Sequence, residues 1–259
     1  MKSRGAALAG RAMVLCAAAI LVIAVATALG AQEKKPGKKE NVTISGDQWK
    51  WRGDNGKSVY TITGSVVVKY TDMTLTADRA EYDEKARIVS AEGNLKIVDP
   101  ENEITGAKAT AYLDERKSII EGSVKLVAKP KPDSAPKNPE STRAKFSQPT
   151  TITCDRIEYL YRKKIATAEG SLKATQKDRV LLGNKAIYDV KQELLTFIGG
   201  VKATDEEGQT FTSPGTVKVS LKEGAEWIEA ENGSATLKVD VEEETSEEAK
   251  PEKGAESKQ

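Results

Sequence analysis

A short pattern of residues recurs along this chain at intervals of 29 residues, and this periodicity constrains the fold more than any other feature of the sequence. The pattern is centred on a glycine followed by alternating apolar residues, as in "AEGNLKI" and "AEGSLKA". The glycines are Gly64, Gly93, Gly122, Gly170 and Gly199. Internal repeats with a period of about 20 to 50 residues indicate stacked supersecondary units that share one core.

One interval is irregular, because 48 residues separate Gly122 from Gly170. The surplus coincides with residues 128–149, which hold five of the nine prolines. Proline-rich segments without apolar periodicity are typical of extended loops. We therefore expect one array of repeats, spanning residues 41–239, that is interrupted by a single loop.

A second column of small residues alternates with the glycine column. Each small residue stands two positions after a large apolar residue, as Ala77 follows Leu75. The small residues are Gly46, Ala77, Gly106, Cys154, Gly183 and Ser213. A small residue within a strand allows a sharp bend, so we expect each unit to bend at this column. We expect Cys154 to act there as a small apolar residue, without a redox or metal role.

The segments that follow the glycines alternate between apolar and polar residues. In "GSVVVKY" Val66 and Val68 share one face, and in "GNLKIV" Leu95 and Ile97 do. This period of two predicts half-buried strands, and short turn-forming segments such as 99–102 predict antiparallel hairpins. The sequence therefore predicts an all-β fold, a bent antiparallel β-jellyroll that is V-shaped in section and built from 29-residue, two-strand units. About twelve strands at a spacing of ~4.8 Å would form a trough ~55 Å long.

The apolar faces of these strands are expected to line the interior of the V. The predicted lining residues are Ile44, Ile62, Val66, Val68, Leu75, Leu95, Ile97, Ile104, Ile120, Val124, Leu126, Ile152, Leu172, Leu181, Phe197, Val201 and Phe211. Two arrangements agree with the pattern. The faces either pack together as an ordinary sandwich core, or they stay apart and admit a ligand with aliphatic chains.

Composition argues against several kinds of active site. The chain has no histidine, which removes the commonest general base and a common metal ligand. Asp78–Arg79 and Asp155–Arg156 could act as catalytic pairs, but their recurrence with the repeat favours an exposed ladder of charges at the bend. A polysaccharide-acting enzyme would need a non-repeating pair of carboxylates at a cleft. We therefore expect no enzymatic activity, no cofactor and no metal site.

Charged residues of both signs are interleaved along the chain, and the formal net charge is +1. This pattern is typical of solvated strand faces and indicates no nucleic-acid partner.

Tyr82, Tyr159 and Tyr188 recur at one position of the repeat, which favours a cross-strand aromatic stack over a sugar site. Trp49 and Trp51, in the first unit, are expected either to cap the end of the trough or to contact a partner.

The two ends of the chain differ from the repeats. Residues 1–30 combine a basic start with an uncharged run of about 18 residues, as in an export signal. This run is close to the lower limit for a spanning helix, so an uncleaved anchor is the alternative. Residues 31–40 form a basic leader, and the acidic, apolar-poor segment 240–259 is expected to be disordered. Cleavage of the signal would leave Cys154 as the one cysteine, which excludes an intramolecular disulfide.

The repeated motifs resemble a known family. The reiterated pattern "[LI]-T-[AG]-D-[RK]-A-x-Y-D", seen in "LTADRAEY" and "ITCDRIEY", is followed by "x-E-G-[NS]-[VL]". Over residues 41–239 this is similar to the OstA-like lipopolysaccharide-transport proteins, which include LptA, LptC and the N-terminal domain of LptD. The resemblance is closest to a periplasmic LptA-type protein. It implies a bent β-jellyroll that holds the acyl chains of lipopolysaccharide, or of a related acylated lipid, in its trough.

The resemblance also implies edge-strand pairing with other Lpt-type jellyroll proteins and allows a head-to-tail homo-oligomer. The function predicted from the sequence is therefore a periplasmic lipid-binding bridge that carries lipopolysaccharide toward the outer membrane. One alternative is an LptC-like component anchored in the inner membrane. Another is a structural or adhesive β-repeat protein without a lipid ligand, which a filled core would favour.

Overall fold

The computed structural model describes the strand-forming part of the chain and its short connections. The described residues are 42–54, 57–70, 72–100, 102–128, 149–205, 207–222, 224–236 and 238. They form 15 strands in one open antiparallel sheet, which confirms the predicted all-β, bent jellyroll class. Within these ranges there is no helix that could span a membrane. The predicted export signal, basic leader and charged tail, and all but the ends of the proline-rich loop, lie outside the described residues.

The strands at the centre of the sheet are long, with 11 to 14 residues each. They are β3 (Lys57–Tyr70), β4 (Met73–Asp83), β5 (Ile88–Val98), β6 (Asn102–Tyr112), β7 (Lys117–Ala128), β8 (Thr150–Leu160), β9 (Ile165–Gln176), β10 (Arg179–Asp189) and β11 (Leu194–Thr204). Shorter strands complete both ends. They are β1 (Val42–Ser45), β2 (Gln48–Asp54), β12 (Thr210–Ser213), β13 (Val217–Ser220), β14 (Trp227–Ala230) and β15 (Ser234–Thr236).

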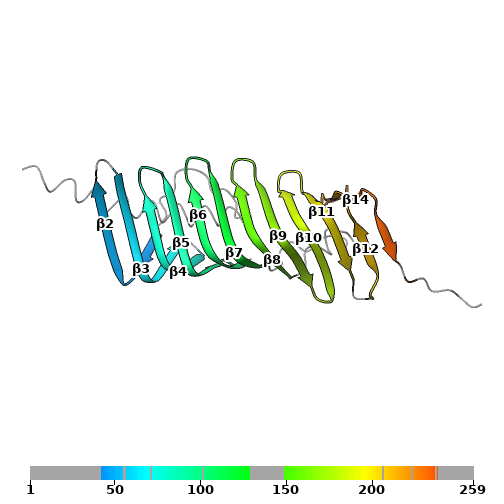
Figure 1. The fold of residues 1–259 in the computed structure, drawn as a ribbon, viewed down its shortest axis with the longest axis horizontal. Helices are drawn as coiled ribbons and strands as arrows, with labels where there is room; N and C mark the ends of the chain where they lie inside the picture. Colours follow the sequence, from blue (N-terminus) through cyan, green and yellow to red (C-terminus); the bar gives the residue numbers. More distant parts are fainter. Residues whose placement is uncertain are drawn as a thin grey trace, which may run out of the picture.

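The sheet is folded lengthwise into two arms that share the long strands, which lie side by side along the molecule (Figure 1). At one end β2 pairs with the first half of β3, and β1 pairs with its second half. At the other end β13 pairs with the first half of β11, and β12 pairs with its second half. Strands β14 and β15 then extend the two halves. We call the arm that contains β2, β13 and β14 the upper arm, and the arm that contains β1, β12 and β15 the lower arm.

The two arms meet along a line of β-bulges, which we call the fold line. At each bulge the repeat glycine and the next residue both have positive φ, as do Gly93 (76°) and Asn94 (46°). The pairing of β5 with β6 shifts there, between Glu92 and Leu95. An extra residue of this kind bends a strand and increases its twist. The same pair of positive φ angles occurs after Gly64, Gly122, Gly170 and Gly199.

In the strands that carry the glycine motif the bulge lies at the glycines, because it needs a positive φ that glycine adopts at little cost. The neighbouring strands cross the same fold line at the column of small residues, where the prediction placed the bend: the pairing of β4 with β5 shifts between Thr76 and Arg79, beside Ala77. The small residues lie opposite the first interior residue after each bulge, as Ala77 lies opposite Val66 and Cys154 opposite Val124. Their small size leaves room for that larger neighbour.

The repeat continues without a break across the proline-rich insertion. Strand β7 pairs directly with β8 from Lys117, opposite Leu160, to Ala128, opposite Thr150. The 48-residue interval thus adds chain between two neighbouring strands and leaves their order unchanged. This agrees with the prediction of a loop inserted into a regular array.

Candidate functional site

The apolar side chains predicted to line the interior fall into rows that cross the sheet from strand to strand. One row, called the lower row, passes through directly opposed residues of the lower arm. Its members are Ile44, Val68, Leu75, Ile97, Ile104, Leu126, Ile152, Ala174, Leu181, Ala203, Phe211 and Ala235. The row therefore runs without interruption from one edge of the sheet to the other.

Two further rows continue the interior across the fold line into the upper arm. The middle row lies beside the fold line and contains the predicted residues Val66, Leu95, Val124, Leu172 and Val201, all buried. The upper row crosses the upper arm through Ile62, Ala80, Ala91, Ala109, Ile120, Ile157, Ala168, Ala186, Phe197 and Val217. Side chains from all three rows belong to one hydrophobic cluster.

The sequence-based prediction missed the alanines of the upper row, because it considered mainly large residues. Ala91 and Ala109 are 0% and 1% exposed, so they are as much part of the interior as Ile62 and Ile120. A signal for them exists in the sequence, since Ala91 lies two residues before the marker Gly93 and Ala109 lies three residues after Gly106 of the small column. Following the period of two through the alanines would have identified them.

The interior is not equally covered along its length. In the lower row Val68, Leu75, Ile97 and Ile104 are 0 to 2% exposed. Beyond β6 the same row is only partly buried, from Leu126 through to Phe211. The N-terminal half of the interior is thus a filled core, and the C-terminal half leaves apolar surface accessible.

Side-chain size accounts for this gradient. In the N-terminal half, large residues of the lower row face the same interior as alanines of the upper row, so large and small side chains complement each other. In the C-terminal half both rows contain alanines: Ala174 and Ala203 in the lower row, Ala168 and Ala186 in the upper row. Alanine has fewer side-chain atoms than leucine or isoleucine, so the space between the two arms is less completely filled there.

Cys154 lies in the interior, beside the middle row, and is 4% exposed. Its Sγ is 3.5 Å from the carbonyl oxygen of Arg156. Burial raises the pKa of this thiol to about 11, which suppresses the thiolate needed for nucleophilic or metal chemistry. This environment agrees with the expectation that Cys154 acts as a small apolar residue.

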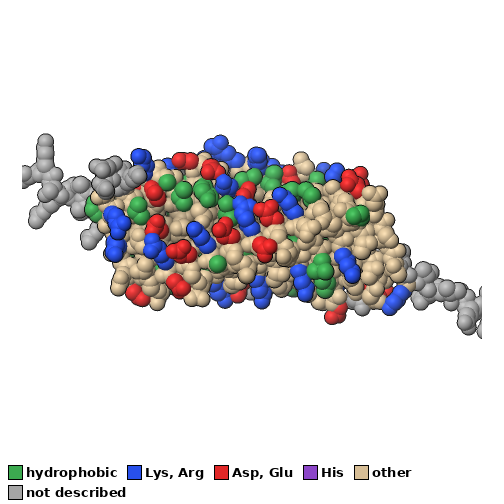
Figure 2. All heavy atoms as spheres, in the orientation of Figure 1, with side chains coloured by type: hydrophobic (Ala, Val, Ile, Leu, Met, Phe, Trp, Pro, Cys, Tyr) green, Lys and Arg blue, Asp and Glu red, His purple; other side chains and the backbone are tan. Residues whose placement is uncertain are grey.

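The outer face at the fold line carries a ladder of ion pairs. Arg156 contacts Glu158 at 2.5 Å and Glu169 at 2.7 Å, and Lys185 contacts Glu169 at 3.3 Å. The hydrogen bond from Arg156, followed by that from Lys185, lowers the pKa of Glu169. Figure 2 shows basic and acidic side chains interspersed over the outer face. The paired charges agree with the predicted exposed ladder, although exposed ion pairs contribute little to stability.

The predicted cross-strand aromatic stack is present at Tyr82, although the repeated tyrosines do not stack on one another. Tyr82 stacks on Tyr60 of β3, with ring centroids 6.1 Å apart, and Tyr159 meets Tyr161 edge to face at 5.0 Å. The column tyrosines are on alternate strands, so smaller residues separate them; Ala166, for example, lies between Tyr159 and Tyr188. Their side chains extend the interior of the upper arm, and burial raises the pKa of Tyr82.

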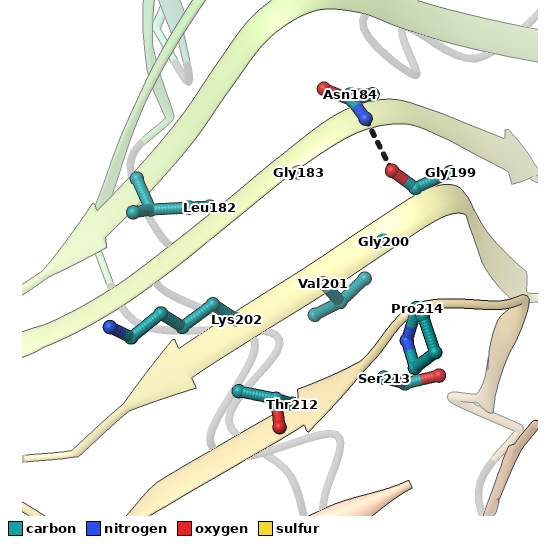
Figure 3. A pocket seen from close by; sticks show the side chains of 10 residues that line it. All are labelled: Leu182, Gly183, Asn184, Gly199, Gly200, Val201, Lys202, Thr212, Ser213 and Pro214. Atoms are coloured by element: carbon teal, nitrogen blue, oxygen red, sulfur yellow. Dashed lines mark hydrogen bonds between the residues drawn. The ribbon is translucent and has the colours of Figure 1, made fainter. Parts of the chain in front are cut away.

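A shallow hollow of about 550 Å³ crosses β10, β11 and β12 at the fold line (Figure 3). Gly183, Gly199 and Gly200 contribute only backbone to it, and Asn184 donates a hydrogen bond to the carbonyl oxygen of Gly199. A Cβ on Gly200 would meet no atom closer than 3.9 Å. The outer surface is thus less filled in the C-terminal half as well.

Both ends of the sheet present large apolar side chains to solvent. Trp49 and Trp51 of β2 are 49% and 62% exposed, and Trp227 and Ile228 of β14 are 44% and 60% exposed. Trp49 lies opposite Ile62 in the upper row, so Trp49 and Trp51 lie on the interior side of the sheet, and Ile228, opposite the buried Val219, lies on the same side. The apolar interior therefore reaches the two open ends of the molecule.

No group of three or more potential metal ligands occurs within the ranges that the structure describes.

The fold and the interior define a class of protein: an open β-sheet, bent along one line, with an aliphatic interior that runs along the stack of strands. The sequence of this chain matches the family described as "LptA/(LptD N-terminal domain) LPS transport protein" over residues 43–193. The chain belongs to this family of lipopolysaccharide-transport components, as its motifs predict.

The matched part ends before β11, so the last strands of both arms lie beyond it. A crystal structure of LptH from Pseudomonas aeruginosa, described as the LptA-homologous periplasmic component of the conserved lipopolysaccharide transport device, is similar to this chain. The identity is 21%, the TM-score is 0.36, and the similarity covers 45% of this chain and 75% of LptH. None of the curated proteins matches this chain.

Proposed function

We propose that this protein is a periplasmic bridge component that holds the acyl chains of lipopolysaccharide, or of a related acylated lipid, between its two arms. One observation carries the proposal: the lower row of apolar side chains is continuous from β1 to β15, and its C-terminal half is partly exposed. Each methylene that moves from water into such an environment gains about 0.8 kcal/mol. A partly exposed aliphatic surface is therefore a favourable place for acyl chains.

The proposed lining of the accessible half consists of residues that the sequence singles out. Leu126, Ile152, Leu181 and Phe211 are partly buried and pack against the hydrophobic core. Their neighbours Ala174 and Ala203 widen the interior without adding polar atoms. Binding of this kind needs no bond making or breaking, which agrees with a transport role rather than an enzymatic one.

Partners follow from the same geometry. Among the described residues, the first and last strands of each arm pair on one side alone, and unpaired edges are sites for strand addition. We propose that such pairing joins this protein to other jellyroll proteins of the transport system, so that one interior continues into the next.

A second candidate function rests on the filled N-terminal half. Val66, Leu75 and Leu95 are at most 1% exposed, as in an ordinary sandwich core. This favours a structural β-repeat protein in which no lipid enters the interior.

Photo-cross-linking from single positions separates the two candidates. A photoreactive amino acid placed at Leu181 faces the interior, whereas the same amino acid at the adjacent Leu182, which is 43% exposed, faces outward. In cells that make lipopolysaccharide, we expect a lipid adduct from position 181 and little or none from position 182. Equal labelling at both positions, or none at position 181, would contradict lipid binding in the interior.

A further inference from the structure

The outer face of the lower arm carries lysines that follow the repeat. They stand three residues after the marker glycines of β5, β7, β9 and β11, and thus on every second strand. We call the outward row that contains them the lysine row. From β5 to β15 this row passes through the directly opposed residues Lys96, Thr105, Lys125, Thr153, Lys173, Leu182, Lys202, Thr212 and Ser234. All of its lysines are exposed.

The equivalent outward row of the upper arm balances its charges. It passes through Arg79, Glu92, Lys108, Glu121, Arg156, Glu169 and Lys185. Opposite charges alternate there from strand to strand, whereas in the lysine row each lysine lies between uncharged residues. At its N-terminal end the lysine row does meet a carboxylate, since Lys96 contacts Glu103 at 2.9 Å. The excess of positive charge therefore lies in the C-terminal half of this face.

The other lysines of the row differ from Lys96. Among the described residues, no ion pair joins Lys125, Lys173 or Lys202 to an acidic side chain. Toward the fold line, Asp155 of β8 supplies one carboxylate on this face. Toward the tip of the arm, the next outward row is uncharged from β7 onward: Val127, Thr151, Thr175, Val180, Thr204, Thr210 and Thr236. The lysines thus form a line of positive charge beside an uncharged strip.

The spacing of these lysines matches a linear polymer with regularly placed acidic groups. Neighbouring strands lie ~4.8 Å apart, so lysines on every second strand are ~10 Å apart. One sugar unit of an extended polysaccharide is about as long as one strand spacing, so a lysine would face every second sugar. A membrane surface is instead bound by broad basic patches with large apolar side chains that enter it. A single line of lysines flanked by threonine and valine favours the polymer.

The C-terminal end of the lysine row leads into the shallow hollow at the fold line (Figure 3). Leu182, Lys202 and Thr212 belong to the row and also line the hollow. The floor of the hollow is glycine backbone, and Asn184 supplies an amide group at its rim. A sugar ring has apolar C–H groups on its faces and hydroxyl groups along its edge. Bare backbone beside a leucine, with hydroxyl and amide groups at the rim, is therefore suited to hold one such ring.

We propose that the lysine row and this hollow bind a linear acidic polysaccharide that carries one carboxylate on every second sugar. Its carboxylates would meet Lys125, Lys173 and Lys202, and one sugar ring would lie in the hollow. Opposite charges arranged at matching intervals give such a contact its specificity. The surface lies on the outside of the sheet, two residues beyond the bulges. It is therefore separate from the interior of the proposed function, and the partner is a polysaccharide other than the sugars of a lipid held there.

Fluorescence anisotropy with a labelled hyaluronan oligosaccharide tests this proposal, because hyaluronan has one carboxylate on every second sugar. We expect the full chain to bind the oligosaccharide with an affinity that falls as salt is added. Joint replacement of Lys125, Lys173 and Lys202 by Gln should weaken binding about tenfold. The matched control replaces three exposed lysines in turns of the upper arm by Gln: Lys85, Lys163 and Lys222. The control removes the same charge and should change the affinity less than twofold.

Several results would overturn the proposal. They are no binding of hyaluronan at low salt, an equal loss in the two triple variants, and equal binding of a neutral chitin oligosaccharide. Tight binding to phosphatidylglycerol vesicles through the same lysines, without binding of hyaluronan, would assign the row to a membrane surface instead.

A single substitution tests the hollow. Thr212→Val removes a hydroxyl group from its rim and should weaken hyaluronan binding about threefold. Thr74→Val, on the outward side of β4 and far from the hollow along the sheet, is the matched control and should leave the affinity unchanged. Equal affinities of the two variants would remove the hollow from the site.

The outcomes for this surface and for the proposed function are distinguishable. The triple lysine variant should still give lipid adducts from a photoreactive amino acid at position 181, because that position faces the interior. Loss of hyaluronan binding with lipid adducts retained would support two separate sites. Loss of both together would overturn the separation of the lysine row from the interior.

Discussion

The two halves of the interior are built from the same repeat but are filled differently. On β3 to β6 the lower row is 0 to 2% exposed, while on β7 to β12 the same row is partly exposed throughout. Strand length, strand pairing and the fold line are alike in both halves. The difference shows that the repeat sets the shape of the scaffold, whereas the sizes of the inward side chains decide whether the interior is a core or an accessible surface.

The largest expected difference between the halves concerns truncation of the lower row. Leu75→Ala removes side-chain atoms from a fully buried site and should lower the free energy of unfolding by about 3 kcal/mol. Leu181→Ala acts at a partly exposed site, where the surroundings are less tightly packed, and should cost about 1 kcal/mol. Urea denaturation of the two variants beside the unaltered protein measures both values. Equal losses would show that the two halves are packed alike.

The fold line offers a second comparison, between β5 and the hollow at β11. An alanine at Gly93 would place its Cβ 2.4 Å from Oδ2 of Asp78, whereas at Gly200 the nearest atom is 3.9 Å away. Both positions have positive φ, which costs about 1–2 kcal/mol for alanine. We expect Gly93→Ala to reduce thermal stability by about 1 kcal/mol more than Gly200→Ala, because the clash is added to the strain. A larger effect at Gly200 would contradict the looser packing of this region.

The pH dependence of stability at Cys154 tests whether water is excluded from the C-terminal half of the interior beside the fold line. Its folded pKa of about 11 lies above the ordinary thiol value, so the stability that this group contributes is present below about pH 8.5 and is lost as the pH rises toward 11. We expect the free energy of unfolding to fall by about 1–2 kcal/mol more between pH 8 and pH 10 than in Cys154→Ala, as measured by chemical denaturation. Identical pH profiles would indicate that water reaches this part of the interior.

The smallest effect is expected at the outer charge ladder. The pKa of Glu169 is lowered by Arg156 and Lys185, so its stabilising contribution is present above the unfolded pKa of about 4.3 and is lost as the pH falls through the folded value. Because the Glu169 side chain is 34% exposed, Glu169→Gln should cost no more than about 0.5 kcal/mol at pH 7. The variant should also lose less stability than the unaltered protein on going from pH 5 to pH 3. A loss of more than about 2 kcal/mol in the free energy of unfolding would mean that the ion pairs contribute substantially to the stability of the bend.

Much of the scaffold was predictable from particular residues. The spacing of Gly64, Gly93 and Gly122 gave the repeat, and the alternation around Val66 and Leu95 gave the strands and their inward faces. The seventeen predicted lining residues fall on the three interior rows, although their contact with a lipid stays a prediction. Strands β14 and β15 were less visible because they lack the glycine motif, and the turn between them is formed at Glu231 and Asn232, with a positive φ of 53° at Asn232.

The sequence by itself determined the repeat, the strand faces and the family, because these depend on local periodicity and on motifs within one unit. Only the tertiary structure decided which residues form the bulges at the bend, how the tyrosines meet and which half of the interior is filled. These features depend on residues brought together from different strands: the glycine that needs a positive φ, the alanine that separates two tyrosines, and the alanines of one arm that face the large side chains of the other. The periodicity of the sequence does not show which side chains meet across strands or how much space they fill together.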